Sequence, residues 1–375
     1  MKRGEIFNQA KRIVIKVGTN VLTKKNNALN LKRVENMVKD IALLRKKGKE
    51  VFLVSSGAIG AGMGRLHLKR RPQIIPLQQA AAAVGQSQLM FVYDKLFRRY
   101  RQVVGQVLLT QEALTDRKRY LNARNTLMTL ISLNVLPVIN ENDTVAVDEI
   151  KVGDNDILSA LVANLVEADL LIILSDIDGF YTGDPKKDKK ARLILEVEKI
   201  TAQVESMASG TTTETAAGGM QTKIQAAKMV TRAGEAMIIA NGTKHNILSK
   251  LFAGEKTGTL FLTEMQDKMA SRKRWIAFRL SVKGVILLDK GAREALVSRG
   301  KSLLPSGIFG CKGKFQPGDV VSIQDDKGRE IARGMINYSH DELEKIKGKK
   351  TQEIEKILGY KYYDEIVHRN NMVIL

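Results

Sequence analysis

Glycines follow an extended apolar run at two points, at one of them beside a lysine, and such sites can bind phosphate. Lys16-Val17-Gly18-Thr19 closes the run RIVIKV. Glycine lets the backbone approach an anion closely, and a lysine at the mouth of a strand can reach its charge. A solvated side chain is the commoner explanation for a single lysine at such a place, so this signal alone is weak. The second motif, SSGAIGAGMG from Ser55 to Gly64, follows VFLV and is neither a P-loop nor a Rossmann fingerprint. Tight packing explains one or two of its four glycines, while all four together favour backbone N–H groups open to a carboxylate or phosphate.

Carboxylates and amides form two further clusters at predicted element ends. Asn140-Glu141-Asn142-Asp143 ends and follows the run VLPVIN, and KVGDND, from Lys151 to Asp156, opens the helical stretch ILSALVANL. Helix capping explains one residue of each cluster. The others could bind an ammonium group, organise lysines or coordinate Mg²⁺ through water.

Two later motifs again combine strand ends, turns and glycines. SDIDGFYTGDP, from Ser175 to Pro185, leaves a strand as a loop, and GGMQTK, from Gly218 to Lys223, starts a helix. The two glycines place N–H groups against an anion. Lys223 is unfavourable in the first turn of a helix unless an anion is present, which favours a functional role.

The elements that must position these residues alternate between strands and helices. Continuous apolar strands separated by helices predict an α/β fold, with a mainly parallel sheet sandwiched by helices, over residues 1–265. Ligands of such folds bind at the carboxyl ends of the strands, where every motif above lies. The predicted strands are 12–17, 51–55, 103–109, 135–140, 170–175 and 236–240, and the clearest helices are 31–47 and 78–101.

A second, small β-rich domain is predicted over residues 275–360. The charged stretch from Gln266 to Arg274 loses the strand–helix alternation and reads as a boundary. Beyond it, VVSIQ and EIARGMI flank Asp325-Asp326-Lys327-Gly328, which predicts a β-hairpin because Asp and Gly supply the turn conformations.

The charge balance points to anionic partners. The chain of 375 residues has 61 Lys and Arg against 40 Asp and Glu, a formal net charge of +21. This excludes an acidic solvating protein and favours phosphates, nucleotides or nucleic acid, without choosing among them.

The cysteine count and the apolar runs bound the remaining classes. A single cysteine, Cys311, excludes an intrachain disulfide and fits a reducing compartment. With only four scattered histidines, it also argues against a zinc cluster of Cys and His, and no metal-binding residue is expected. The most apolar stretch, residues 158–174, is broken by Asn164, Glu167 and Asp169, so we expect no membrane span and a cytoplasmic protein.

These motifs together resemble the amino-acid kinase family, and the resemblance covers essentially the whole chain. It rests on KVGTNVLT, VSSGAIGAG, VLPVINEND, EIKVGDND, SDIDGFYTGDP and GGMQTK, and in the tail on RKRW, KSLLPSGI and a PUA-like domain. VINEND with KVGDNDxLSA resembles the members that phosphorylate the side-chain carboxylate of L-glutamate, the first step of proline biosynthesis. One small departure is Ser175, where Thr is expected in many relatives, and the hydroxyl is retained.

The resemblance implies a role for each motif. Lys16 and Lys223 would approach the transferring phosphoryl group from two sides, with Asp156, or alternatively Asp154, holding the lysines and Mg²⁺ bridging the phosphates. Ser56, Asp143 and Asn155 are assigned to glutamate. The ATP-binding residues implied are Lys16, Ser175, Asp176, Ala217, Gly218, Gly219, Met220, Gln221, Thr222 and Lys223.

The implied product, γ-glutamyl phosphate, is a labile acyl phosphate. The family therefore implies transfer to a partner reductase, glutamate-5-semialdehyde dehydrogenase (γ-glutamyl phosphate reductase), together with feedback inhibition by proline and a homo-oligomer.

Two alternative functions stay open. One is a sister kinase acting on aspartate, acetylglutamate, carbamate or UMP, which VINEND and KVGDND disfavour. The other is an RNA-binding protein, suggested by the +21 charge and the tail, although aromatic residues are only 5% and form no interleaved platform.

Overall fold

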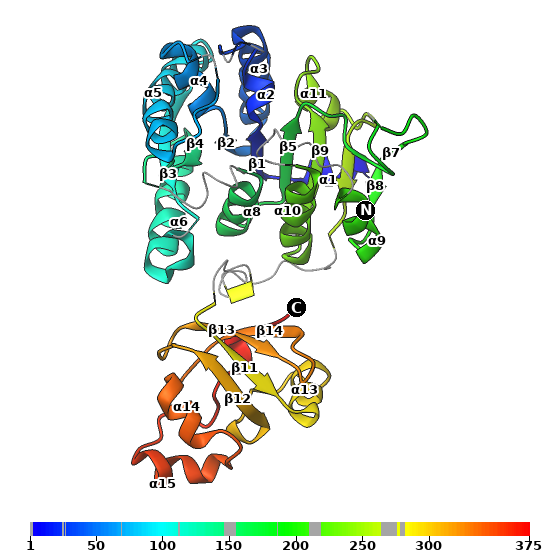
Figure 1. Cartoon of the computed structure of the whole chain (residues 1–375). Helices are drawn as coiled ribbons and strands as arrows, with labels where there is room; N and C mark the ends of the chain where they lie inside the picture. Colours follow the sequence, from blue (N-terminus) through cyan, green and yellow to red (C-terminus); the bar gives the residue numbers. More distant parts are fainter. Residues whose placement is uncertain are drawn as a thin grey trace. The chain divides into compact units, whose positions relative to one another are not determined.

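The chain divides into two compact units, residues 1–268 and 269–375, and each has its own sheet and its own hydrophobic core (Figure 1). The predicted fold class, a mainly parallel sheet between helices plus a smaller strand-rich domain, is confirmed. The stretch 266–274, predicted as a boundary, lies outside the described residues. The computed structural model describes residues 3–24, 26, 28–68, 70–111, 113–145, 155–185, 187–209, 219–263, 276–277 and 282–375.

An eight-stranded sheet forms the centre of the first unit. All neighbouring strands from β3 to β9 in the spatial order run parallel, and β10 is antiparallel to β9. In spatial order the strands are β3 (Val103–Leu109), β4 (Val135–Glu141), β2 (Glu50–Ser55), β1 (Arg12–Val17), β5 (Leu170–Ser175), β9 (Ala236–Asn241), β10 (Thr259–Phe261) and β8 (Glu196–Val197).

The predicted strands of this sheet agree with the structure to within one residue. The predicted strands 12–17, 103–109 and 170–175 coincide with β1, β3 and β5, while β2 begins one residue earlier and β4 and β9 end one residue later. The central strands are buried on both faces, which is why their sequences are continuous apolar runs.

Helices cover both faces of the sheet, above and below it in Figure 1. The predicted helix 31–47 is α3, which ends at Lys46. The predicted helix 78–101 is α5, which begins three residues earlier because Pro76 fits its first turn, and which ends at Arg98. One layer contains α1 (Arg3–Gln9), α3 (Leu31–Lys46), α5 (Ile75–Arg98) and α11 (Ile247–Phe252), and the other contains α6 (Arg117–Ser132), α8 (Asn155–Val166), α9 (Ala202–Ser209) and α10 (Met220–Arg232).

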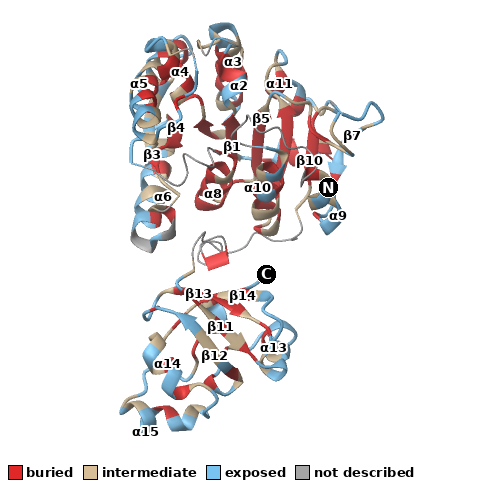
Figure 2. Cartoon of the chain, viewed as in Figure 1, coloured by how far each residue is buried: buried red, intermediate tan, exposed pale blue. Residues whose placement is uncertain are grey.

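Helix α8 is the most deeply buried helix of its layer. It packs on β1 and β5 and has α6 and α10 beside it, so nearly all of its residues are buried (Figure 2). A helix covered all round is apolar all round, which explains the apolar run from Ile157 to Val166. None of the described helices is both long enough and apolar enough to cross a bilayer.

Two glycines of SSGAIGAGMG have clear structural roles in the fold. Gly57 begins α4 (Ala58–Arg65) with a φ of +96°, which glycine adopts without strain. Gly62 faces α5, where a Cβ would lie 1.7 Å from the carbonyl oxygen of Ala81, and Gly85 of α5 approaches α4 equally closely. Gly62 is therefore one of the glycines that packing explains, because it brings two helix backbones together. The anion-binding role of the other glycines stays a prediction.

Gly62→Ala should destabilise the first unit. The added methyl group meets backbone atoms, which cannot move aside as a flexible side chain would, and such overpacking costs about 1–3 kcal/mol or more. Urea unfolding should show a lower midpoint at an unchanged slope. Gly4→Ala is the matched control, because nothing lies within 4 Å of the added atom. Equal midpoints for the two variants would contradict this packing role.

The second unit is built on a five-stranded sheet with its own core. Strands β13 and β14 form the predicted hairpin, in which Asp325 accepts hydrogen bonds from Lys327 N and Arg329 N. The sheet also includes β15, beyond residue 360, and several helices accompany it. In spatial order the strands are β12 (Ile308–Gly313), β11 (Gly284–Leu288), β13 (Val320–Gln324), β14 (Glu330–Met335) and β15 (Met372–Ile374), and the helices are α13 (Lys290–Val297), α14 (His340–Ile346) and α15 (Ile354–Leu358).

Candidate active site

The candidate site lies at the carboxyl edge of the sheet, where the strand order reverses. Strand β1 has β2 on one side and β5 on the other, so the chain leaves β1, β2 and β5 at neighbouring points. Backbone hydrogen bonds tie these ends together, from Gly18 N to Leu174 O (2.9 Å) and from Ser56 N to Val17 O (3.0 Å). In open α/β sheets such a switch point forms the crevice in which ligands bind.

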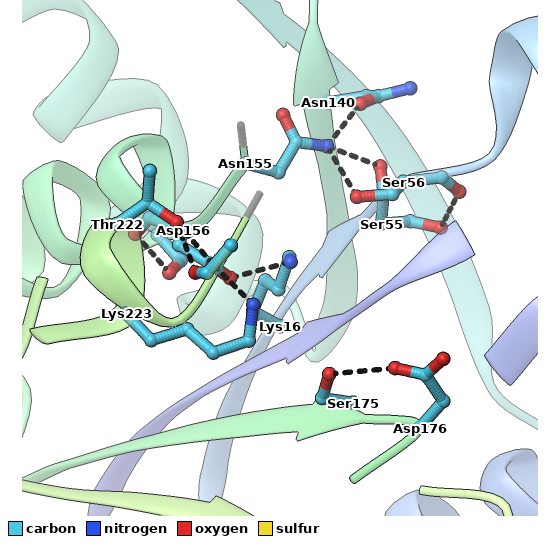
Figure 3. Close-up of polar contacts among 12 residues, drawn as sticks. Lys16, Ser55, Ser56, Asn140, Asn155, Asp156, Ser175, Asp176, Thr222 and Lys223 are labelled. Carbon is cyan, nitrogen blue, oxygen red and sulfur yellow. Dashed lines mark hydrogen bonds and ion pairs between the residues drawn. The ribbon is translucent and has the colours of Figure 1, made fainter. Parts of the chain in front are cut away.

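Two buried lysines share one buried carboxylate at this edge. Lys16 Nζ, at the end of β1, lies 2.5 Å from Asp156 Oδ1, and Lys223 Nζ, from the first turn of α10, lies 2.9 Å from Asp156 Oδ2 (Figure 3). Asp156 is fully buried, and the two lysines are only 5% and 4% exposed. Two ammonium groups on one carboxylate leave a net positive charge at the point where β1, α8 and α10 meet.

The electrostatics of this triad keep Asp156 ionised. Burial alone would raise the pKa of the Asp156 carboxyl, but the charges and hydrogen bonds of Lys16 and Lys223 lower it well below its usual range. The carboxylate is therefore charged throughout the physiological range, and it holds both ammonium groups in position.

A second cluster begins at the neighbouring residue, Asn155, and points in a different direction. The amide nitrogen of Asn155 lies within hydrogen-bonding distance of Ser56 Oγ (3.1 Å), Ser55 O (3.0 Å) and Asn140 Oδ1 (2.8 Å), as Figure 3 shows. The first two residues of α8 thus serve different groups, since Asn155 joins the ends of β2 and β4 while Asp156 organises the lysines.

Helix α5 supports this second cluster with two residues that the sequence motifs do not include. Gln86 Oε1 accepts a hydrogen bond of 2.7 Å from Asn140 Nδ2, and the Tyr93 hydroxyl lies 2.8 Å from Ser55 Oγ. Burial raises the pKa of Tyr93, so its hydroxyl keeps the proton. Neither residue belongs to a motif, and only knowledge of which helix covers β2 and β4 could have identified them.

The start of α10 brings backbone and side-chain donors beside the triad. Thr222 Oγ1 lies 3.3 Å from Asp156 Oδ2 and donates to Gly219 O at 2.8 Å. Gly219 is extended and precedes the helix, and no described side chain caps it, so the N–H groups of the first turn, at Met220 and Gln221, can face an anion. Ala217 and Gly218, also predicted to bind ATP, lie outside the described residues, as does Asp154.

Ser175 and Asp176 lie at the end of β5, away from the two clusters in Figure 3. Ser175 Oγ donates to Asp176 Oδ1 at 3.3 Å, and Asn20 Nδ2 donates to Asp176 Oδ2 at 2.9 Å. The loop after β5 is thereby held against the short helix α2 (Thr19–Leu22), which follows β1. Asn20 is a contact that the sequence motifs did not single out.

Asp143 lies two residues beyond the end of β4, the strand that carries Asn140 of the Asn155 cluster. Burial raises the pKa of the Asp143 carboxyl to about 6, and the charge of Arg71 opposes this rise. In the part of the chain that the structure describes, this carboxylate has no hydrogen-bond partner. A half-buried carboxylate that accepts no hydrogen bond from the described residues is suited to receive a cationic group of a ligand.

Comparison with known proteins gives the same organisation. The sequence matches the amino acid kinase family over residues 11–241 and the PUA domain over residues 284–358. It is 55% identical to glutamate 5-kinase of Caldanaerobacter subterraneus subsp. tengcongensis, covering 97% of this chain and 98% of the relative. It is 49% identical to glutamate 5-kinase of Geobacter sulfurreducens, covering both chains completely.

The same fold occurs in a distant solved structure. Carbamate kinase from Giardia lamblia bound to AMP-PNP aligns with 68% of this chain and 99% of its own, with a TM-score of 0.50 and 20% identity.

Proposed function

Because the chain belongs to the amino acid kinase family, and within it to the glutamate 5-kinases, we propose that it transfers the γ-phosphoryl group of ATP to the side-chain carboxylate of L-glutamate. The chain is thus an enzyme, a phosphotransferase, and its product is γ-glutamyl phosphate. The observation that carries the proposal is the pair of buried lysines held on Asp156 at the switch point of the sheet.

The triad supplies what phosphoryl transfer needs. Such transfer demands positioning and neutralisation of the charge on the phosphoryl oxygens, and no covalent nucleophile. Lys16 and Lys223 come from different elements and would contact the transferring group from two sides. Asp156 keeps both ammonium groups in place before the substrates arrive, so little reorganisation is needed at the moment of reaction.

The remaining residues divide between the two substrates. We assign Ser175, Asp176 and the first turn of α10 to ATP, and Ser56, Asp143 and Asn155 to glutamate. Asp143 would pair with the substrate ammonium. The amide oxygen of Asn155 is directed away from the Ser55–Ser56 turn in Figure 3 and could accept a further hydrogen bond from the substrate.

Mg²⁺ is the usual companion of ATP, and the described residues offer it little. Both oxygens of Asp156 are taken by lysines, and both oxygens of Asp176 accept hydrogen bonds from side chains. Mg²⁺ prefers oxygen ligands and retains several waters, so it would be held mainly by the nucleotide phosphates. We assign no step of the mechanism to a protein-bound ion.

Trapping of the product tests the proposal. The purified chain is incubated with ATP, Mg²⁺, hydroxylamine and one acid at a time, chosen from glutamate, acetylglutamate, aspartate and carbamate. Hydroxylamine converts acyl phosphates into hydroxamates, and glutamate alone should give one. A hydroxamate from another acid would reassign the substrate, and nucleotide-dependent phosphorylation of UMP would assign the chain to a different class of kinase.

Asp143→Asn should weaken glutamate binding while leaving ATP binding largely intact. Loss of one charged hydrogen bond to the substrate ammonium costs about 1.5–3 kcal/mol, which is roughly 10- to 150-fold in KM for glutamate. Steady-state kinetics with each substrate varied in turn measures the effect. An equal rise in both KM values would mean that the site had collapsed.

The pH dependence of KM gives an independent check of this pairing. Because the pKa of Asp143 is raised to about 6, the free enzyme loses this negative charge as the pH falls through 6. The KM for glutamate should therefore rise below pH 6 in the unsubstituted protein, and it should show no such rise in Asp143→Asn.

We propose that residues 1–265 form the catalytic domain and that the PUA domain, predicted over residues 275–360, is not needed for turnover. All the candidate site residues lie in the first unit, which has its own core. A chain ending at Thr263 should fold and phosphorylate glutamate. A folded truncation without turnover, checked by circular dichroism, would show that the second unit completes the active site.

The other properties that the family implies stay predictions. The product would pass to γ-glutamyl phosphate reductase, proline would inhibit the enzyme, and the protein would form a homo-oligomer in the cytoplasm. The PUA domain match and the +21 charge favour RNA as a further partner. If the chain binds RNA through phosphate contacts, affinity should fall steeply between about 50 and 200 mM salt.

A further inference from the structure

The second unit brings three metal-ligating side chains together, far from the kinase site in sequence. Cys311 lies on β12, and His340 and Glu344 lie on α14, which packs against β12. One ligand atom from each residue lies within 4.8 Å of the other two. His340 and Glu344 are four residues apart, so they lie on the same face of the helix, toward the cysteine.

The chemistry of this set suits Zn²⁺. Zinc binds thiolate sulfur, imidazole nitrogen and carboxylate oxygen at about 2.0–2.3 Å, which places tetrahedral ligand atoms about 3.5 Å apart. The ligand atoms lie within 4.8 Å of one another, so each pair would need to come closer by only about 1 Å. A thiolate and a carboxylate carry two negative charges with a neutral imidazole, which balances the charge of the ion.

We propose that Cys311, His340 and Glu344 bind a Zn²⁺ ion, with water as the fourth ligand, and that the ion clamps α14 to β12. Without metal, Cys311 Sγ donates to Glu344 Oε1 at 3.0 Å. On binding, this S–H bond breaks, the sulfur keeps the electron pair and bonds to zinc, and the proton passes to solvent. Glu344 Oε1 is then free to bind the ion, while Oε2 keeps its ion pair with Lys347 at 2.7 Å.

Neighbouring groups hold the ligands in place. The ring of Phe315 packs edge-on against His340, with 5.4 Å between the ring centroids, and Phe315 itself is buried.

Counting cysteines and histidines alone argues against a zinc cluster in this chain. That count omits Glu344, which only the packing of α14 on β12 places beside the cysteine. Since Cys311 is the single cysteine of the chain, any thiolate–metal bond reports on this site.

Cobalt titration of the full-length chain tests the site. Protein stripped of metal with a chelator is titrated with Co²⁺, whose bond to thiolate gives a charge-transfer absorption band, and Zn²⁺ is then added. We expect one Co²⁺ per chain, a thiolate band, and displacement of the cobalt by Zn²⁺. Cys311→Ser should abolish the band. Loss of an outer partner of a metal ligand already costs about 10–100-fold in affinity, so His340→Ala and Glu344→Gln should each cost about 100-fold or more.

His245→Ala is the matched control, because His245 is exposed and lies in the other unit, and it should bind Co²⁺ like the unsubstituted chain. Circular dichroism checks that each variant is folded, and the near-isosteric Glu344→Gln keeps the test valid if His340→Ala unfolds the second unit. Absence of a thiolate band, or a band of equal affinity in Glu344→Gln, would overturn the proposal, because the cysteine would then bind no metal or bind it alone.

Discussion

Asp156→Asn should be the most damaging single substitution in the kinase unit, lowering both stability and turnover. The change leaves the ammonium groups of Lys16 and Lys223 buried without their counter-charge. Breaking a buried ion pair by removing one partner costs about 3–5 kcal/mol. Urea unfolding at pH 7 should show this loss, and the variant should have little turnover even where it is folded, since its lysines are no longer held in position.

The nucleotide dependence of Asp156→Asn should identify the cause of this loss. ATP supplies negative charge to the same two lysines, so saturating ATP should restore part of the lost stability of the variant. A thermal midpoint that ATP leaves unchanged would mean that the loss does not come from the uncompensated lysine charges.

Asp40→Asn is the matched control for Asp156→Asn. Asp40 is a buried carboxylate of the same unit, but its partners are neutral donors, Leu248 N at 3.1 Å and Ser249 Oγ at 2.7 Å. This variant should lose some stability and keep its turnover below its unfolding temperature. A loss of turnover equal to that of Asp156→Asn would mean that any buried carboxylate of the unit has the same effect, and the lysine triad would lose its special role.

The sheet could be predicted closely because its physical cause is local. A strand covered on both faces must be apolar along most of its length, and the runs RIVIKV and LLIILS both show this pattern. The predicted helix 78–101 begins three residues after the start of α5, because Pro76 fits the first turn of a helix but adds nothing to the helical pattern of the sequence. The role of Gly62 depends on which helix lies opposite, and that neighbour, around Gly85, is distant enough in sequence to leave no local sign.

The candidate site could be predicted as a set of residues, but its geometry could not. The strand-end rule brought Lys16, Ser56 and Asp143 to one edge of the sheet, and the family resemblance gave them roles. The exact partner of the lysines required the structure, which places the carboxylate of Asp156 between residues 16 and 223. Gln86 and Tyr93 hold the second cluster from α5, and their types are common on any buried helix face.

Lys223→Ala should separate the chemistry from the fold. Asp156 keeps its ion pair with Lys16, so one negative and one positive charge remain buried together and no charge is left without a partner. Stability should therefore fall much less than in Asp156→Asn. Because Lys223 would meet charge that develops on the phosphoryl group, kcat should fall about 10²–10⁴-fold, or about 3–5 kcal/mol in the barrier, with a smaller change in KM for glutamate.

Lys228→Ala provides the matched control on the same helix. Lys228 pairs with Glu205 of α9, and its side chain is 36% exposed, so its removal takes one lysine from α10 without touching the triad. Its kcat should stay within about twofold of the unsubstituted enzyme, because an exposed ion pair contributes only about 0–1 kcal/mol to stability and nothing to the site. If Lys223→Ala retained most of its kcat, Lys223 would be a structural partner of Asp156. The phosphoryl group would then be neutralised by Lys16 and the backbone N–H groups at the start of α10.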